Sequence, residues 1–93
     1  MNHKQAMKEI LNFYGGRAQI IKAIEELNEL SVVLCKILNS KKETSVLNAA
    51  LKSEMADVEI MLYQLKLIFP NLDFNSDIDF KVNRTLEIIK NKQ

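Results

Sequence analysis

Residues 45–69, S-V-L-N-A-A-L-K-S-E-M-A-D-V-E-I-M-L-Y-Q-L-K-L-I-F, are the stretch that decides the fold. Apolar side chains recur here at intervals of three and four residues, which is the period of an α-helix and not the alternation of a strand. Pro70 follows directly and cannot continue a helix. The spacing therefore predicts one long helix that starts near Thr44 or Ser45, either of which could cap it, and ends at Phe69.

The rest of the chain is punctuated in the same way. Its only glycines are the adjacent pair Gly15 and Gly16, and its only proline is Pro70, whereas a small sheet protein would need turn residues far more often. We therefore predict three further helices, at about 4–14, 17–38 and 76–91, the last capped by Ser76. The predicted fold is all-α, a single four-helix bundle-like domain that spans residues 1–93.

Composition limits the classes of function. The 13 basic and 12 acidic residues leave a net charge of +1, which argues against a dedicated nucleic-acid binder, and no long apolar run predicts a membrane span. The one cysteine, Cys35, cannot form an internal disulfide and is expected to be a small buried side chain in a reduced, cytoplasmic protein. A chain of 93 residues has a marginal core, so we expect a homodimer or homotetramer.

Two acidic residues of the 45–69 helix lie where acids are not expected. At ~100° per residue, Glu54 and Asp57 fall inside the apolar stripe, whereas Glu59 falls on the polar face and serves as an internal control. Their neighbours in the stripe are Leu47, Ala50, Val58, Met61, Leu65 and Ile68. An acid in an apolar stripe needs a compensating partner, because a buried ionised carboxylate is costly.

The 17–38 helix repeats this pattern less sharply. Its main apolar stripe consists of Ile20, Ile24, Leu27, Leu34 and Leu38. Glu26 lies at the edge of the stripe, and Glu29 follows it at the i+3 spacing that brings two side chains together on a helix. Glu26, Glu29, Glu54 and Asp57 would repel one another if they converged, and a divalent cation is the simplest compensator.

The ligand chemistry favours Mg²⁺, with Mn²⁺ as a possible substitute, because the available ligands are almost all carboxylate oxygens. Mg²⁺ usually completes its shell with water and phosphate oxygens, so a phosphorylated substrate is expected. Lys81 and Arg84, an i, i+3 pair on the last predicted helix, are the candidate phosphate ligands.

These acids stand in a split motif, E-x-x-E followed by E-x-x-D. Here it consists of Glu26-Leu-Asn-Glu29 and Glu54-Met-Ala-Asp57, with residues 30–53 as the spacer. In this respect the chain resembles the MazG-like all-α nucleoside triphosphate pyrophosphohydrolases. The resemblance extends to Gln19, which resembles a glutamine often found upstream of the motif, and more weakly to K-V-N-R at 81–84.

The resemblance implies a helical bundle that assembles as a dimer or tetramer. It implies that the four acids bind Mg²⁺, and that the enzyme hydrolyses a nucleoside or deoxynucleoside triphosphate to the monophosphate and pyrophosphate. Gln19, Lys81 and Arg84 would then bind the substrate. Base preference stays open, with Phe13, Tyr14, Phe69, Phe74 and Phe80 as candidate stacking residues.

Two alternatives remain open. The four acids could form buried salt bridges with Lys81 and Arg84, in which case the protein is a non-catalytic helical oligomerisation or protein-interaction module. A degenerate family member could also bind nucleotide without hydrolysing it.

Overall fold

The computed structural model describes residues 2–40 and 45–93, and these residues form four helices and no strand. The helices are α1 (Lys4–Tyr14), α2 (Gly16–Asn39), α3 (Ser45–Ile68) and α4 (Phe74–Asn91). The predicted all-α class is therefore confirmed. In the described part of the chain, no helix is both long and apolar enough to cross a membrane. Thr44, the other predicted cap of α3, lies outside the described ranges.

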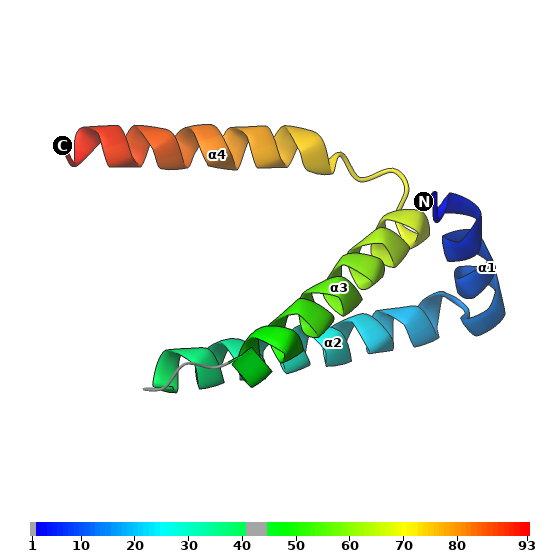
Figure 1. Cartoon of the computed structure of the whole chain (residues 1–93). Coiled ribbons are helices and arrows are strands. Elements are labelled where there is room, and N and C mark those ends of the chain that lie inside the picture. The colour runs from blue at the N-terminus through cyan, green and yellow to red at the C-terminus, as the bar shows by residue number, and fades with distance from the viewer. Residues whose placement is uncertain (1, 41–44) are drawn as a thin grey trace.

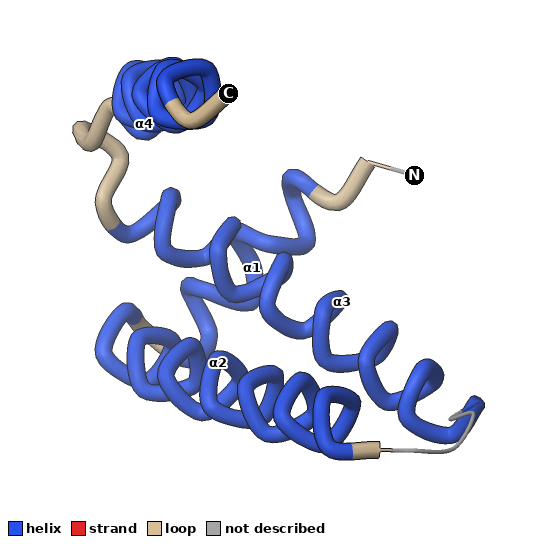
Figure 2. Tube along the Cα trace, turned by 90° about the vertical axis from the view of Figure 1, so that its left-hand side faces the viewer, coloured by secondary structure: helices blue, strands red, loops and turns tan. Residues whose placement is uncertain are grey.

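The centre of the fold is the pair of long helices α2 and α3, which are connected antiparallel neighbours (Figure 1). The short helix α1 packs against both near the start of α2 (Figure 2). Among the described residues, the buried apolar core contains only Ala23, Val58 and Met61. Three polar side chains, Gln19, Glu26 and Gln64, are buried beside it. This is a small core for a chain of this length.

The two faces of α3 are those that the sequence predicts. Val58 and Met61 are buried and Glu54 and Asp57 are half-buried, as are their apolar neighbours in the stripe. Glu59, the internal control, is exposed, together with the rest of the polar face, Asn48, Lys52, Tyr63 and Lys66. The helical period thus places both acids on the face of α3 that packs against α2.

A chain of buried amides ties the first three helices together. Gln64 of α3 is completely buried, with a relative exposure of 0%. Its Nε2 donates to the backbone oxygen of Met7 in α1 at 2.9 Å, and its Oε1 accepts from Nε2 of Gln19 in α2 at 3.2 Å. Pairing of buried polar groups avoids a desolvation penalty, so this chain of bonds positions α1 against the α2–α3 pair.

A single residue, Gly15, separates α1 from α2. Its φ of 85° and ψ of 158° lie in a region that only glycine adopts readily. Gly16 is already the first residue of α2, so the break occupies one residue rather than the expected pair.

The predicted stripe of α2 is largely exposed in one chain. Ile24, Leu27, Leu34 and Leu38 are all accessible, because the face of α2 that meets α3 is centred on Gln19, Ala23 and Glu26 instead. Cys35 is also exposed, so its predicted burial is wrong. It lies beside the open stripe rather than on the face toward α3.

Helix α4 stands apart from the other three helices. It begins two residues earlier than predicted, because Asp73 and not Ser76 is its N-cap: Asp73 Oδ1 accepts from the backbone N–H of Ser76 at 3.1 Å. Beyond its first turn, no packing of α4 against α1, α2 or α3 occurs within the described ranges, and the two views agree that it stands apart (Figures 1 and 2). A closed bundle of four helices is therefore not formed within one chain.

Candidate metal centre

Three of the four predicted acids come together between α2 and α3. Glu26, Glu29 and Glu54 each offer a carboxylate oxygen, and these oxygens all lie within 4.8 Å of one another. The helical repeat explains this geometry, since Glu26 and Glu29 are one turn apart on α2 and Glu54 lies on the facing side of α3. Glu26 is buried, Glu54 is half-buried and Glu29 is exposed. The cluster therefore reaches from the helix interface to the solvent.

Two oxygens of this cluster lack a partner. Glu26 Oε2 and Glu54 Oε2 are shielded from water, and neither makes a hydrogen bond within the described residues. Burial raises the pKa of Glu54, and the negative charges of Glu29, Glu26 and Asp57 raise it further. The surroundings of Glu54 thus disfavour its ionised form.

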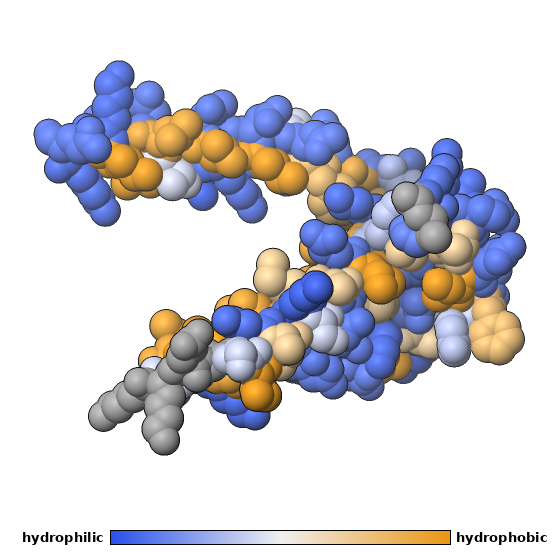
Figure 3. Space-filling model, viewed as in Figure 1, coloured by the Kyte–Doolittle hydropathy of each residue, from blue (hydrophilic) through white to orange (hydrophobic). Residues whose placement is uncertain are grey.

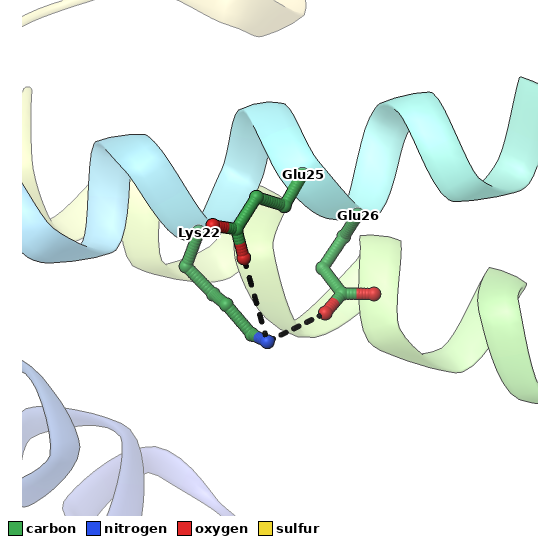
Figure 4. Close-up of polar contacts among 3 residues, drawn as sticks. All are labelled: Lys22, Glu25 and Glu26. Carbon is green, nitrogen blue, oxygen red and sulfur yellow. Dashed lines mark ion pairs between the residues drawn. The ribbon is translucent and has the colours of Figure 1, made fainter.

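One lysine partly compensates the cluster. Lys22 Nζ lies 3.0 Å from Glu26 Oε1 and 3.8 Å from Glu25 Oε2. Figure 4 draws both ion pairs. The hydrogen bond and charge of Glu26 raise the pKa of Lys22 and keep the ammonium protonated. The lysine approaches only one oxygen of Glu26, however, and it leaves Glu26 Oε2 and Glu54 Oε2 unpaired.

The residues present fit a divalent cation. Three carboxylates supply hard oxygen ligands from two helices, which is the donor set of Mg²⁺ and Mn²⁺ rather than of structural Zn²⁺. Exposure of Glu29 leaves one side of the cluster open, where water or a phosphate oxygen would complete the shell. A cation would also remove the charge repulsion that raises the pKa of Glu54.

A pocket of about 430 Å³ adjoins the acids on the side of α1. Glu26 and Asp57 line it, together with Lys22, Gln19 and the aromatic ring of Tyr14. Its other walls are apolar and come from Ile10, Ala18, Ile60 and Met61. An apolar cavity of this size with a few polar groups at one end is typical of small-molecule sites.

The structure places two predicted site residues at this pocket rather than in the glutamate cluster. Asp57 lines the pocket beside Glu26 and is not among the three acids whose oxygens converge. Gln19 is only 6% exposed, and its Nε2 donates to Gln64. The side chain of Gln19 borders the pocket, but its amide is already hydrogen-bonded to Gln64 and so holds α2 against α3.

Lys81 and Arg84 are not brought to the acids of their own chain. Both lie on α4, which packs against neither α2 nor α3 beyond its first turn. The Arg84 guanidinium lies 5.8 Å from the centroid of the Phe80 ring. Within the described residues neither side chain forms an ion pair with the four acids, so the internal salt-bridge alternative gains no support.

Sequence reasoning missed two residues of the site. Lys22 could have been found, because it lies four residues before Glu26 on the same helix, a spacing that pairs opposite charges. Gln64 carried a weaker signal: at ~100° per residue it falls about 80° from Glu54, at the edge of the apolar stripe, but its partners are distant in the sequence.

Comparison with known proteins identifies no relative. No protein-family model, no curated protein and no solved structure matches this chain.

Proposed function

We propose that this protein is a Mg²⁺-dependent hydrolase that converts a nucleoside or deoxynucleoside triphosphate to the monophosphate and pyrophosphate. One observation carries the metal part of the proposal. Two shielded carboxylate oxygens, Glu26 Oε2 and Glu54 Oε2, lack a partner inside a cluster of three converging glutamates. Unpaired buried acids are costly unless a cation offsets them.

In this proposal Glu26, Glu29 and Glu54 hold the cation, and Asp57 extends the acidic wall into the adjoining pocket. The bound metal supplies Lewis-acid chemistry and lowers the pKa of a coordinated water. Mn²⁺ is the expected substitute, since it takes the same oxygen ligands.

The substrate class follows from the chemistry beside the acids and from the resemblance of the split acidic motif. Mg²⁺ bound by few carboxylates normally shares its shell with phosphate oxygens. The neighbouring pocket offers Tyr14 as a stacking surface for a base and Lys22 as a cation for a phosphate. A nucleoside fits within a volume of about 430 Å³ lined mostly by apolar groups.

Lys81 and Arg84 remain the proposed phosphate ligands of α4. Because α4 does not approach the acids of its own chain, these two residues would contact the substrate of a second subunit. Gln19 is proposed to act mainly by holding the pocket wall in place through Gln64.

The test is Mg²⁺-dependent release of pyrophosphate from a panel of standard and modified nucleoside triphosphates. Glu54→Gln is the inactivating variant, and Glu59→Gln is its matched control, because Glu59 is an exposed acid on the opposite face of the same helix. We expect product from the wild type and from Glu59→Gln but not from Glu54→Gln. Equal activity in all three proteins would contradict the site assignment.

The second candidate is a non-catalytic helical oligomerisation module, which the large exposed apolar stripes favour. Thermal unfolding with increasing Mg²⁺ or Mn²⁺ separates the two proposals. A ligand that binds only the native state raises Tm progressively with its concentration, whereas a salt-bridged scaffold responds only to general ionic strength. Metal-dependent stabilisation without product from any nucleotide would indicate a protein that binds nucleotide but does not hydrolyse it.

A further inference from the structure

The isolated chain exposes more surface than a compact protein of its mass. Its accessible surface is 7872 Å², whereas a folded monomer of 10.7 kDa is expected to expose ~5,500 Å². Its radius of gyration is 16.9 Å, against ~12 Å for a compact chain of this length. An excess of ~2,400 Å² is at the upper end of what one subunit of an obligate homodimer buries, since such interfaces total ~2,000–5,000 Å² over both subunits.

Exposed side chains, four of them apolar and one a threonine, follow one another along one side of α4. Phe74, Ile78, Val82, Thr85 and Ile89 follow one another at intervals of four, four, three and four residues. Apolar residues at these intervals form the seam along which one helix packs against another. All of these residues are exposed, and Figure 3 shows a band of apolar atoms along the side of α4 that faces the open space beside α2 and α3.

Helix α2 carries a second seam of the same kind. Its positions Ile20, Ile24, Leu27, Ser31, Leu34 and Leu38 alternate strictly between spacings of four and three residues. This side of α2 lies next to, and not on, the face that packs against α3, and Leu38 at its end is 85% exposed. A seam of this kind packs against another helix. In a single chain, both seams are largely exposed to solvent.

We propose that a second copy of this chain covers both seams, so that α4 and α2 form the interface of an obligate homodimer. A second copy is the occupant that the structure favours, because it supplies two open helical seams to match the two that are open here. The surface exposed in excess also has the size that such a dimer buries. The proposal does not depend on the proposed enzymatic activity.

The first measurement is the mass of the full-length wild type by sedimentation equilibrium over a range of concentrations. We expect two chains per particle, or four if two dimers associate. A monomer at every concentration would overturn the proposal, because it would mean that α4 closes on its own chain or that a different protein covers the seams.

The second measurement uses a matched pair of variants on α4. Val82→Glu puts a charge in the seam, and Phe80→Glu puts the same charge about 200° away on the opposite face of the same helix. Both side chains are exposed in one chain, at 52% and 65% respectively. We expect Val82→Glu to lose at least ten-fold in association affinity and Phe80→Glu to keep the mass of the wild type. Equal masses for all three proteins, or equal dissociation of both variants, would refute the assignment of α4.

Amide hydrogen exchange on the wild type provides a readout without substitution. We expect protection of α4 to rise with protein concentration in step with the particle mass, because association orders and covers the helix. Rapid exchange throughout α4 in particles of two chains would also overturn the proposal.

Discussion

Replacement of Gln64 by methionine removes the hydrogen bonds that join α1, α2 and α3, including a long one from Gln64 Nε2 to Met7 Sδ at 3.5 Å. Methionine is an unbranched side chain of similar length, so packing is largely preserved and the change isolates the polar contacts. The backbone oxygen of Met7 loses its side-chain donor at 2.9 Å but keeps the N–H one turn later in α1, whereas Nε2 of Gln19 loses its acceptor at 3.2 Å. Both groups stay wholly or partly shielded from water, because neither can move far.

The expected cost is large for a small protein. A buried polar group left unpaired costs ~1–3 kcal/mol, and the amide of Gln19 is the one group left so, which gives an expected loss of about 1–3 kcal/mol. At ~4–8 °C per kcal/mol for a domain of this size, Tm falls by roughly 4–24 °C. The double variant Gln19→Leu/Gln64→Met also removes the amide of Gln19, which the single variant Gln64→Met leaves without a hydrogen-bond partner. Its loss should be smaller than the sum of the two single losses by about 1–3 kcal/mol.

The assay is urea unfolding followed by circular dichroism, with all four proteins at one concentration because the proposed association would contribute to stability. An unchanged m-value would show that the variants unfold from equally compact states. If Gln64→Met lay within about 0.5 kcal/mol of the wild type, the chain of buried amides would not hold α1 in place and the reasoning would fail.

Four further predictions concern other parts of the fold. Because burial and nearby acids raise the pKa of Glu54, the native state without metal binds a proton more tightly than the unfolded state. Its stability should therefore fall as the pH rises from the ordinary glutamate pKa through the raised native value, and this dependence should flatten in Glu54→Gln when Tm is measured against pH. Gly15→Ala should cost about 1–3 kcal/mol, because alanine does not readily adopt a φ of 85°, although its Cβ would meet no neighbour. Gly16→Ala should be neutral or stabilising in the same unfolding assay. Asp73→Ala should lose ~1 kcal/mol and reduce the helicity of the first turn of α4, a change that amide exchange would detect. If α4 completes the site of a second subunit, mixing inactive Glu54→Gln and Arg84→Ala chains should restore up to about a quarter of the wild-type pyrophosphate release, and no recovery after exchange of subunits would count against a shared site.

The features that follow from local pattern could be predicted. The helical period of residues 45–69 predicts which side of α3 faces inward, and it places Glu54 and Asp57 on that side. The pairing of Glu26 with Glu29 follows from the same geometry on α2. Glu26 and Glu29 meet Glu54 because the faces of α2 and α3 that carry them pack together. Two short motifs far apart in the sequence therefore predict one cluster.

The remaining features depend on contacts that no local pattern encodes. The strongest apolar stripe of α2 predicts a covered face, yet Leu34 and Leu38 are exposed, because the face of α2 that packs against α3 is the one that contains Ala23. Asp73 and Ser76 are both good N-caps, and only the path of the loop decides that Asp73 is used. The position of α4, and with it the placement of Lys81 and Arg84, depends on tertiary partners that a single chain does not supply.

In the proposed homodimer, the small apolar core has a consequence for how the amount of assembled protein responds to its rate of synthesis. Ala23, Val58 and Met61 form a small core for a chain of this length, so in such a dimer folding would be coupled to assembly. When chains are scarce, the concentration of assembled particles rises with the square of the chain concentration. Trace expression therefore yields disproportionately little assembled protein, and unassembled chains are exposed to proteolysis. In such a dimer the amount of assembled protein would not rise in proportion to synthesis. It would stay low until the concentration of chains passed a threshold.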